Sequence, residues 1–287
     1  MAINGFFKYD KPGPGVRKDE KKKKMFFAFL EIWGRNVFKL ITVNLVYTIF
    51  SILLLPGGLA AAGMTNVARN LARDKHSFGL SDFFDTIRKN WKQALPAGII
   101  NNVVTIALGF ALVFYYLDVF NDYGGILSIA GLGFSTACFV IFTFMKYYFW
   151  LLVITFKLPL SKIYKNCFTF AFANFLPNLL VTAVNLLLYG GTAAVVGTLL
   201  YFNVMPWEMG WIPLLIVALF YPGFSHIFTQ MCIFPKVKKL MIDPYYEAHP
   251  GEDIELRRGL GLEISEDEEE NLFNDSDALE NEKHSEN

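Results

Sequence analysis

Charged side chains are missing from five long stretches of this chain, each of which is mainly apolar. These stretches run from Leu40 to Ala68, Gln93 to Leu117, Tyr123 to Met145, Asn166 to Trp207 and Met209 to Pro235. About 20 apolar residues are enough for a helix to cross the hydrocarbon core of a bilayer, which is about 30 Å thick. The pattern predicts an all-α membrane protein, with no soluble segment left for a separate catalytic domain.

The connections between these stretches alternate in charge. Basic residues gather in residues 1–24, 69–92, 157–165 and 236–239, whereas residues 118–123 and 202–210 carry only acidic charges. The positive-inside rule places the basic segments in the cytoplasm and the two acidic connections outside. The N-terminus and residues 69–92 then lie on the same side, so an even number of crossings separates them.

This even number requires the first apolar stretch to cross twice. Pro56-Gly57-Gly58 interrupts it, and proline and glycine break helices. The small residues that follow suit a helix packed against neighbours, where backbones approach closely. Six transmembrane helices are therefore predicted, at residues 36–55, 57–73, 96–118, 125–154, 175–202 and 211–234. The alternative is five, with residues 57–73 lying in the interface.

Two segments of the chain resemble each other at an offset of 80 to 81 residues. Gly79-Leu80-Ser81 leads to Leu95-Pro96, and Pro159-Leu160-Ser161 leads to Leu176-Pro177. Ser81 and Ser161 suit the N-cap position of a helix. The pattern predicts two interfacial amphipathic helices on the cytoplasmic side, each leading into a long apolar helix. It amounts to a weak parallel internal repeat, of a kind that some transporters use, or to a duplicated scaffold without a transport path.

The first of these interfacial helices has a clear apolar face. Phe83, Phe84, Ile87 and Trp91 recur at helical spacing, and charged residues occupy the rest of the surface. Such a helix is expected to lie in the headgroup plane of the membrane lipid. The residues predicted to contact the interface are Phe84, Arg88, Lys89, Trp91 and Lys92.

The two ends of the chain have opposite charge. Residues 1–24 hold eight basic and three acidic groups, and residues 263–287 hold eleven acidic groups and one lysine. We expect a basic cytoplasmic segment at residues 1–24, a polytopic membrane domain at 25–240 and an acidic, disordered cytoplasmic tail at 241–287. This is a multi-pass arrangement in the cell membrane with both termini in the cytoplasm.

The sequence contains no recognisable motif of a soluble enzyme, no metal-binding pattern and no cofactor fingerprint, so no catalytic role, metal, cofactor or nucleic-acid partner is expected. Two ionisable residues inside apolar stretches are candidates for a functional role, because charge at membrane depth is costly. Lys146 is the first. His226, which has Ser225 and Gln230 near it at helical spacing, is the second. Hydrogen-bonded packing is the alternative explanation for the histidine.

Lys146 has an alternative explanation too, which the sequence favours. Its long side chain could extend to the cytoplasmic interface as an anchor, and no acidic residue in the apolar stretches is available to neutralise it. Asn44, Asn101, Asn102 and Asn185 add further polar groups, which suit either interhelical hydrogen bonds or a solute path. The spacings Gly58-xxx-Ala62 and Ala193-xxx-Gly197 predict close helix contacts, within one chain or between chains.

Three segments together resemble the YesL family of bacterial integral membrane proteins, whose shared domain has no established function. They begin at Gly5-Phe6-Phe7-Lys8-Tyr9-Asp10, Pro56-Gly57-Gly58-Leu59-Ala60 and Phe78-Gly79-Leu80-Ser81-Asp82-Phe83-Phe84. The resemblance covers about residues 5–240 and is densest before residue 100; the acidic tail departs from the family pattern. It implies a Gram-positive bacterial origin and a link to carbohydrate transport, because family members are often encoded beside sugar importers.

Two functional hypotheses follow from the sequence. The leading one is a non-enzymatic integral membrane protein that serves as an accessory or assembly partner of a carbohydrate uptake system, in contact with sugar-importer permease subunits. The second is a small-solute transporter or channel in its own right. An intramembrane enzyme would need convergent acids or bases at membrane depth, and the charge-free stretches contain no Asp or Glu.

Overall fold

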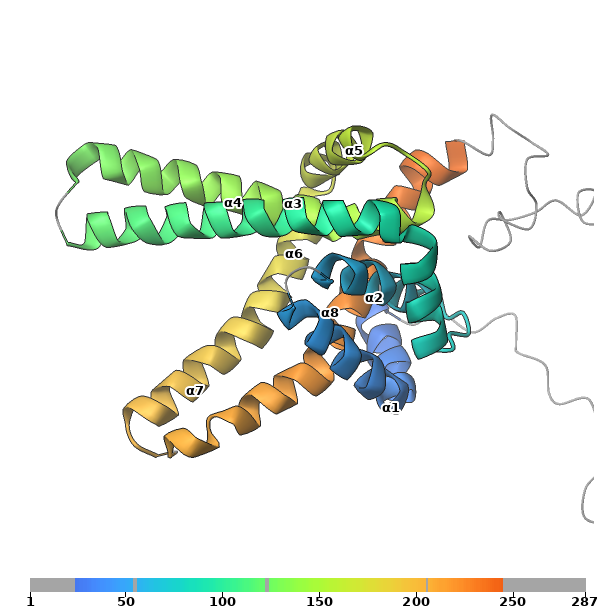
Figure 1. The fold of residues 1–287 in the computed structure, drawn as a ribbon, viewed down its shortest axis with the longest axis horizontal. Helices are drawn as coiled ribbons and strands as arrows, with labels where there is room; N and C mark the ends of the chain where they lie inside the picture. Colours follow the sequence, from blue (N-terminus) through green and yellow to red (C-terminus); the bar gives the residue numbers. More distant parts are fainter. Residues whose placement is uncertain (1–23, 54–55, 122–123, 205, 245–287) are drawn as a thin grey trace, which may run out of the picture.

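The computed structural model describes residues 24–244 except 54–55, 122–123 and 205. Every regular element of the described residues is a helix, as expected for an all-α protein (Figure 1). The basic segment at 1–24 and the acidic tail at 241–287 lie almost entirely outside these residues, so the expectations for both stay predictions.

The helices follow one another with short connections. The first four are α1 (Met25–Ile52), α2 (Gly57–Ala72), α3 (Leu80–Phe120) and α4 (Gly125–Thr155). They are followed by α5 (Leu160–Ala173), α6 (Phe175–Asn185), the π-helical turn η1 (Leu186–Gly190) and α7 (Gly191–Tyr201). The last are the short 3-10 turn η2 (Trp207–Met209), α8 (Trp211–Val237) and the π-helical turn η3 (Lys238–Ile242).

Four helices are long and apolar enough to cross a membrane. They are α3, α4, the continuous helix Phe175–Tyr201 formed by α6, η1 and α7, and the continuous helix Trp211–Ile242 formed by α8 and η3. Each has more residues than the roughly 20 that a bilayer requires. The protein is therefore a multi-pass membrane protein, as the charge-free stretches predict.

The first apolar stretch breaks where the sequence predicts, between α1 and α2. However, α1 begins at Met25, well before the predicted start at residue 36. No proline or glycine cluster separates Met25 from residue 36, so the helical hydrogen bonds continue through Glu31, Arg35 and Lys39. Neither α1 nor α2 is among the four helices that suffice to span by length and composition.

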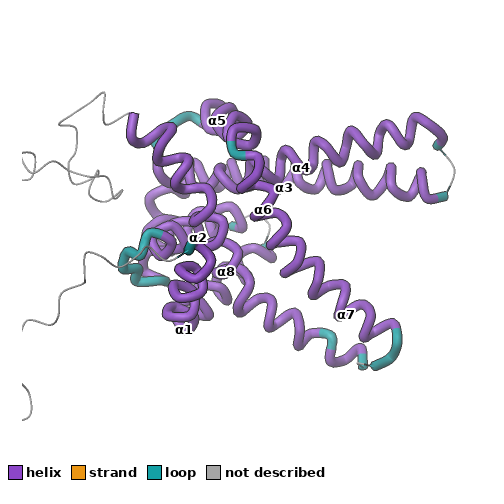
Figure 2. Tube along the Cα trace, turned by 180° about the vertical axis from the view of Figure 1, so that it is seen from behind, coloured by secondary structure: helices purple, strands orange, loops and turns teal. Residues whose placement is uncertain are grey.

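Two long helical hairpins dominate the shape of the protein. In Figures 1 and 2, α3 and α4 lie side by side as one hairpin, and α6–α7 with α8 forms the other. The two hairpins diverge from a common base in which α1, α2 and α5 pack against the neighbouring parts of the hairpins. Apolar side chains on the hairpin arms, among them Phe110, Ile126 and Leu187, are exposed, and lipid chains are an equally apolar environment for them.

The first interfacial segment is not a separate helix. It continues into the long arm as the single helix α3, with Pro96 inside it. Figure 1 shows that α3 bends between its first turns and the arm, and an internal proline, which removes one backbone hydrogen bond, is the usual cause of such a bend. The second segment is separate, because Asn174 interrupts the helix between α5 and α6.

Ser81 and Ser161 are not N-caps, so that prediction is wrong. The N-cap residues of α3 and α5 are Gly79 and Pro159, and neither helix start has a capping hydrogen bond from the N-cap side chain. The carboxylate of Asp82, in the first turn of α3, instead holds the preceding turn in place. Its Oδ2 accepts hydrogen bonds from the backbone N–H of Phe78 at 3.0 Å and from Ser77 Oγ at 2.7 Å.

The close contact predicted at Gly58 is confirmed and holds α2 against α3. A Cβ atom built at Gly58 would lie 2.5 Å from the Cα of Gly98 and 2.8 Å from the carbonyl oxygen of Ala94. Only two glycines allow backbones to approach this closely. The second spacing differs, because a Cβ atom at Gly197 would meet no described atom within 4 Å.

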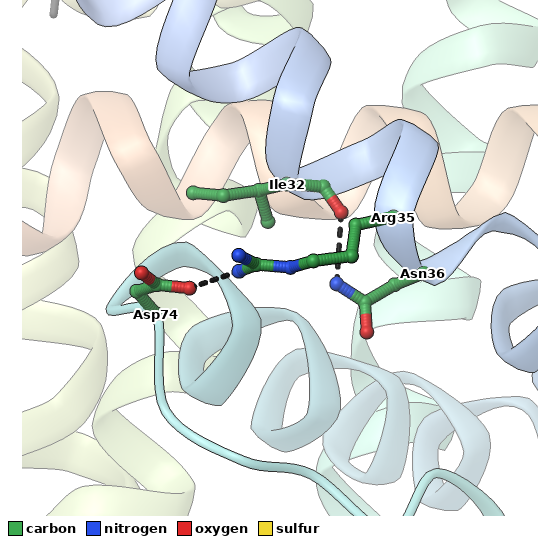
Figure 3. Close-up of polar contacts among 4 residues, drawn as sticks. All are labelled: Ile32, Arg35, Asn36 and Asp74. Carbon is green, nitrogen blue, oxygen red and sulfur yellow. Dashed lines mark hydrogen bonds and ion pairs between the residues drawn. The ribbon is translucent and has the colours of Figure 1, made fainter. Parts of the chain in front are cut away.

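Polar contacts tie α1 to the connection between α2 and α3. The guanidinium of Arg35 forms an ion pair with Asp74, and the side-chain amide of Asn36 donates to the carbonyl of Ile32 at 2.8 Å (Figure 3). Lys39 Nζ donates to the carbonyl of Ser77 at 2.5 Å. Arg35, which precedes the predicted span, and Lys39, near its start, thus both have partners in the connection between α2 and α3.

Candidate binding cavity in the membrane domain

A cavity of about 310 Å³ lies where the two hairpins meet the base. Five helices supply its lining: Tyr47 from α1, Ala61 and Thr65 from α2, Thr143, Lys146, Tyr147 and Trp150 from α4, Asn185 from α6, and Ser225, His226, Thr229 and Gln230 from α8. Ligand sites in proteins start at about this volume, near 300 Å³. Most of the lining side chains are polar, which is unusual inside a membrane domain.

Lys146 faces the interior of the protein. Its side chain is half-buried and lines the cavity, and Nζ donates a long hydrogen bond of 3.4 Å to Thr105 Oγ1 on α3. The side chain therefore contacts a neighbouring helix at the cavity, and its functional role stays a prediction. The sequence favours the anchor because no acidic side chain in the apolar stretches could pair with the ammonium group of Lys146. None of the described residues that line the cavity is acidic either.

His226 lines the same cavity, one turn beyond a proline in α8. Its Nδ1 lies 2.9 Å from the carbonyl oxygen of Pro222, and because a carbonyl only accepts, Nδ1 carries the proton. In the neutral ring Nε2 is then an acceptor. The ring also packs edge-on against Tyr47, with 5.2 Å between centroids.

Pro222 explains why α1 and α8 are joined by polar contacts here. Proline cannot donate to the carbonyl of Ala218 one turn earlier, and Thr48 Oγ1 donates to that carbonyl at 3.4 Å. Asn44 Nδ2 donates to the neighbouring carbonyl of Leu219 at 2.6 Å. Backbone groups freed inside a membrane helix are commonly satisfied by side chains of a neighbouring helix.

The serine and threonine hydroxyl groups of the lining already donate hydrogen bonds within the protein. Thr65, Thr143 and Thr229 donate to carbonyls of their own helices at 2.7, 2.8 and 2.7 Å, and Ser225 donates to the side-chain carbonyl of Asn185. Since a hydroxyl has one proton and two lone pairs, each of these oxygens keeps acceptor capacity. Gln230 adds another acceptor: the residue is 2% exposed, and its Oε1 has no hydrogen-bond partner among the described residues.

A buried network fixes the helices beside the cavity. Tyr148 OH donates to Asn178 Oδ1 at 2.6 Å and accepts from Asn174 Nδ2 at 2.7 Å, while Asn178 Nδ2 donates to the carbonyl of Ala171 at 3.1 Å. These bonds join α4, α5 and α6. The network satisfies its own members, so it positions the wall of the cavity and does not offer groups to a ligand.

A similar contact joins α3 to α5. Tyr164 OH donates to Asn101 Oδ1 at 3.2 Å, and burial raises the pKa of Tyr164 to about 12, so the hydroxyl keeps its proton. Asn44, Asn101 and Asn185 therefore all take part in interhelical hydrogen bonds, one of the two roles expected from the sequence.

The predicted interfacial residues lie elsewhere. Phe84, Arg88, Lys89, Trp91 and Lys92 are all exposed on the first part of α3, and none lines the cavity. Sequence reasoning missed Tyr47, Thr65 and Thr229 as cavity residues. These three residues could have been found as polar residues inside the charge-free stretches. Within the described part of the chain, no three His, Cys, Asp or Glu side chains gather as a metal site would require.

Comparison with known families gives one match. The family described as a protein of unknown function, DUF624, matches residues 40–113. This segment holds Tyr47, Ala61 and Thr65 of the cavity and the contact between Gly58 and Gly98. The match is to an uncharacterised domain family, in agreement at this coarser level with the resemblance found in the sequence. No curated protein and no solved structure matches the chain.

Proposed function

We propose that the protein is a non-enzymatic, multi-pass protein of the cell membrane that handles a small polar solute through its central cavity. This is the transporter or channel that the sequence offers as its second hypothesis. The observation that carries it is the convergence of Lys146 and His226, which lie far apart in the sequence, on one cavity. Neither residue would need to share a polar space if each served only to anchor or pack its own helix.

The arrangement of the hairpins supports the same proposal. Most of the lining residues of the cavity come from α4 and α8, and these two helices belong to different hairpins (Figure 1). A change in the angle between the hairpins would alter access to the cavity. Rigid-body rocking of one bundle against another around a fixed site is a common basis of alternating access.

Solute flux through vesicles that contain only this purified protein tests the proposal. We expect uptake of at least one compound from a panel of small sugars, sugar acids and amino acids, above that of empty vesicles and reduced in Lys146→Leu. The control is Lys157→Leu, because Lys157 is exposed just beyond α4 and does not line the cavity. No flux of any compound, together with stoichiometric co-purification of a sugar-importer permease from native membranes, would favour an accessory role instead.

The accessory role is the second proposal, and one observation favours it. The small residues Ala193 and Gly197 lie one turn apart on the same face of α7, both are exposed, and a Cβ atom at Gly197 would meet no described atom within 4 Å. Small residues on a membrane helix favour close association with another helix. A permease subunit packed on this face would suit an assembly partner of a carbohydrate uptake system, the function that the family resemblance implies.

The proposed topology has six crossings, with α1 and α2 added to the four long helices, and both termini in the cytoplasm. In this arrangement the first part of α3 lies at the cytoplasmic headgroup level, where each of Arg88, Lys89 and Lys92 would gain about 1 kcal/mol near anionic lipid. The two parallel repeats each consist of a helix that enters the cytoplasmic side, an interfacial segment and a helix that leaves it. They are α2 with α3, and α4 with α5 and α6. The exposed positions of Phe84 and Trp91 on this part of α3 support the arrangement.

Single cysteines test this topology in a background without native cysteines. An impermeant thiol reagent added outside intact cells is expected to label Glu208→Cys and Asp122→Cys, and to label Arg73→Cys and Lys89→Cys only after the membrane is opened. Labelling of Arg73→Cys from outside would contradict the even number of crossings before residue 73.

A further inference from the structure

We infer that the cavity is built for a small organic anion that carries several hydroxyl groups, such as a hydroxylated carboxylate. This inference rests on the proposed function, because it names the class of solute that the same cavity would take. It follows from an inventory of which hydrogen-bonding groups of the lining are donors and which are acceptors.

The anionic part of the ligand follows from Lys146. It is the one residue of the described lining with a full positive charge, and no acidic side chain shares the lining. An ammonium has three protons to donate, and within the described residues Nζ makes a single hydrogen bond, of 3.4 Å, to Thr105 Oγ1. The cost of a cation in this setting falls when an anion lies beside it. A carboxylate would accept the remaining donors with charge-assisted bonds.

The hydroxyl groups of the ligand follow from the rest of the lining. The protons of Thr65, Thr143, Thr229 and Ser225 are engaged within the protein. Nδ1 of His226 donates to Pro222, so Nε2 of the neutral ring accepts. Gln230 Oε1 is buried without a partner, and a buried acceptor left unsatisfied is costly. The lining thus offers one cationic donor, neutral donors in the side-chain amides of Asn185 and Gln230 and the indole of Trp150, and several acceptors. A complementary ligand presents one anionic acceptor and several hydroxyl groups, which both donate and accept.

Aromatic side chains and volume agree with such a ligand. Tyr47, Tyr147 and Trp150 line the same space and provide flat apolar surfaces for the C–H faces of a polyhydroxylated chain. The hydroxyl of Tyr147 is engaged with Thr182 Oγ1 at 2.8 Å, so its ring is held in place. A cavity of about 310 Å³ suits a single small molecule.

Three probes with related skeletons test the two parts of the inference separately. D-gluconate carries both a carboxylate and hydroxyl groups, D-glucitol carries only hydroxyl groups, and hexanoate carries only the carboxylate. Calorimetric titration of the purified full chain in phosphatidylcholine nanodiscs is expected to show gluconate binding at least about tenfold more tightly than either of the others. Glucitol lacks the charge-assisted hydrogen bond of the carboxylate, and hexanoate lacks the neutral hydrogen bonds of the hydroxyl groups.

Variants connect the binding to the cavity. Lys146→Gln is expected to weaken gluconate binding about tenfold or more while leaving glucitol binding unchanged, and Lys157→Gln, outside the cavity, is expected to change neither. Gln230→Leu is expected to weaken gluconate and glucitol alike and to leave hexanoate unchanged.

Different results would contradict the anionic part and the hydroxyl part of the inference. Equal binding of glucitol and gluconate to the wild type would overturn the anionic part and leave a polar-solute site intact. Equal binding of hexanoate and gluconate would overturn the hydroxyl part. If none of the three binds while another compound of the flux panel is transported, the inference is wrong and the proposed function stands. If nothing binds and nothing is transported, both fail.

Discussion

Replacing Gly98 by alanine is expected to destabilise the membrane domain by about 1–3 kcal/mol, the usual cost of forcing a group into a packed contact. A Cβ atom at this position would lie 2.6 Å from the Cα and 3.0 Å from the N of Gly58. Both are backbone atoms, so no side-chain rearrangement can relieve the clash, and α2 has to move away from α3. Thr65 and Ala61 of the cavity lie on α2, so the variant is also expected to weaken solute binding.

Gly109→Ala is the matched control. Gly109 lies in the same helix, and a Cβ atom there would meet nothing within 4 Å. Alanine is a better helix former than glycine by about 1 kcal/mol, so this variant is expected to be neutral or slightly stabilising. Unfolding of both variants by a denaturing detergent in mixed micelles measures the difference. Equal stability of the two variants would show that the contact between Gly58 and Gly98 does not hold the base together.

The sequence predicts the helical class and the long apolar arms well, because a stretch without charge is a direct property of the sequence. The stretch from Gln93 to Leu117 falls within α3, and the described part of the stretch that ends at Met145 falls within α4 from Gly125 on. These are the two helices of one hairpin. Helix starts are predicted less well. Ser81 is predicted to cap α3, but the helix already begins before this residue, with Gly79 as its N-cap, and Asp82 binds the turn that precedes the helix. The conformation of that turn decides where the helix begins.

The cavity was predicted only in part. Lys146 and His226 stand out in the sequence because charge at membrane depth is costly, and Ser225 and Gln230 were associated with His226 by helical spacing. Helical spacing connects residues only within one helix, however. The approach of α4 to α8, and of both to Thr65 on α2, depends on tertiary packing such as the contact between Gly58 and Gly98. The sequence therefore identifies Lys146 and His226 but cannot place them together.

The internal repeat shows the same limit. Its two copies correspond to segments that lead into the two hairpins, but Pro96 lies within the continuous helix α3, whereas Asn174 separates α5 from α6. Similar sequences therefore precede two different junctions. A proline in a helix can be accommodated as a bend or can end the helix, and the neighbouring helices decide which occurs.

The central claim is that polar side chains at membrane depth enclose a space that holds water or solute. The reactivity of a cysteine at Thr143 tests it most directly, because the thiolate that reacts forms only where water reaches. Thr143 lines the cavity, whereas Val140, three residues earlier in α4, is exposed and does not line it. The two positions differ by only about 4.5 Å along the helix.

In a chain without native cysteines, reconstituted in lipid, the account predicts that a small water-soluble methanethiosulfonate reagent modifies Thr143→Cys at least about tenfold faster than Val140→Cys. It also predicts that the reaction slows when Lys146 is replaced by leucine, because the nearby positive charge favours the thiolate. Equal, slow modification of Thr143→Cys and Val140→Cys would show that no wet cavity exists at this depth and would contradict the account.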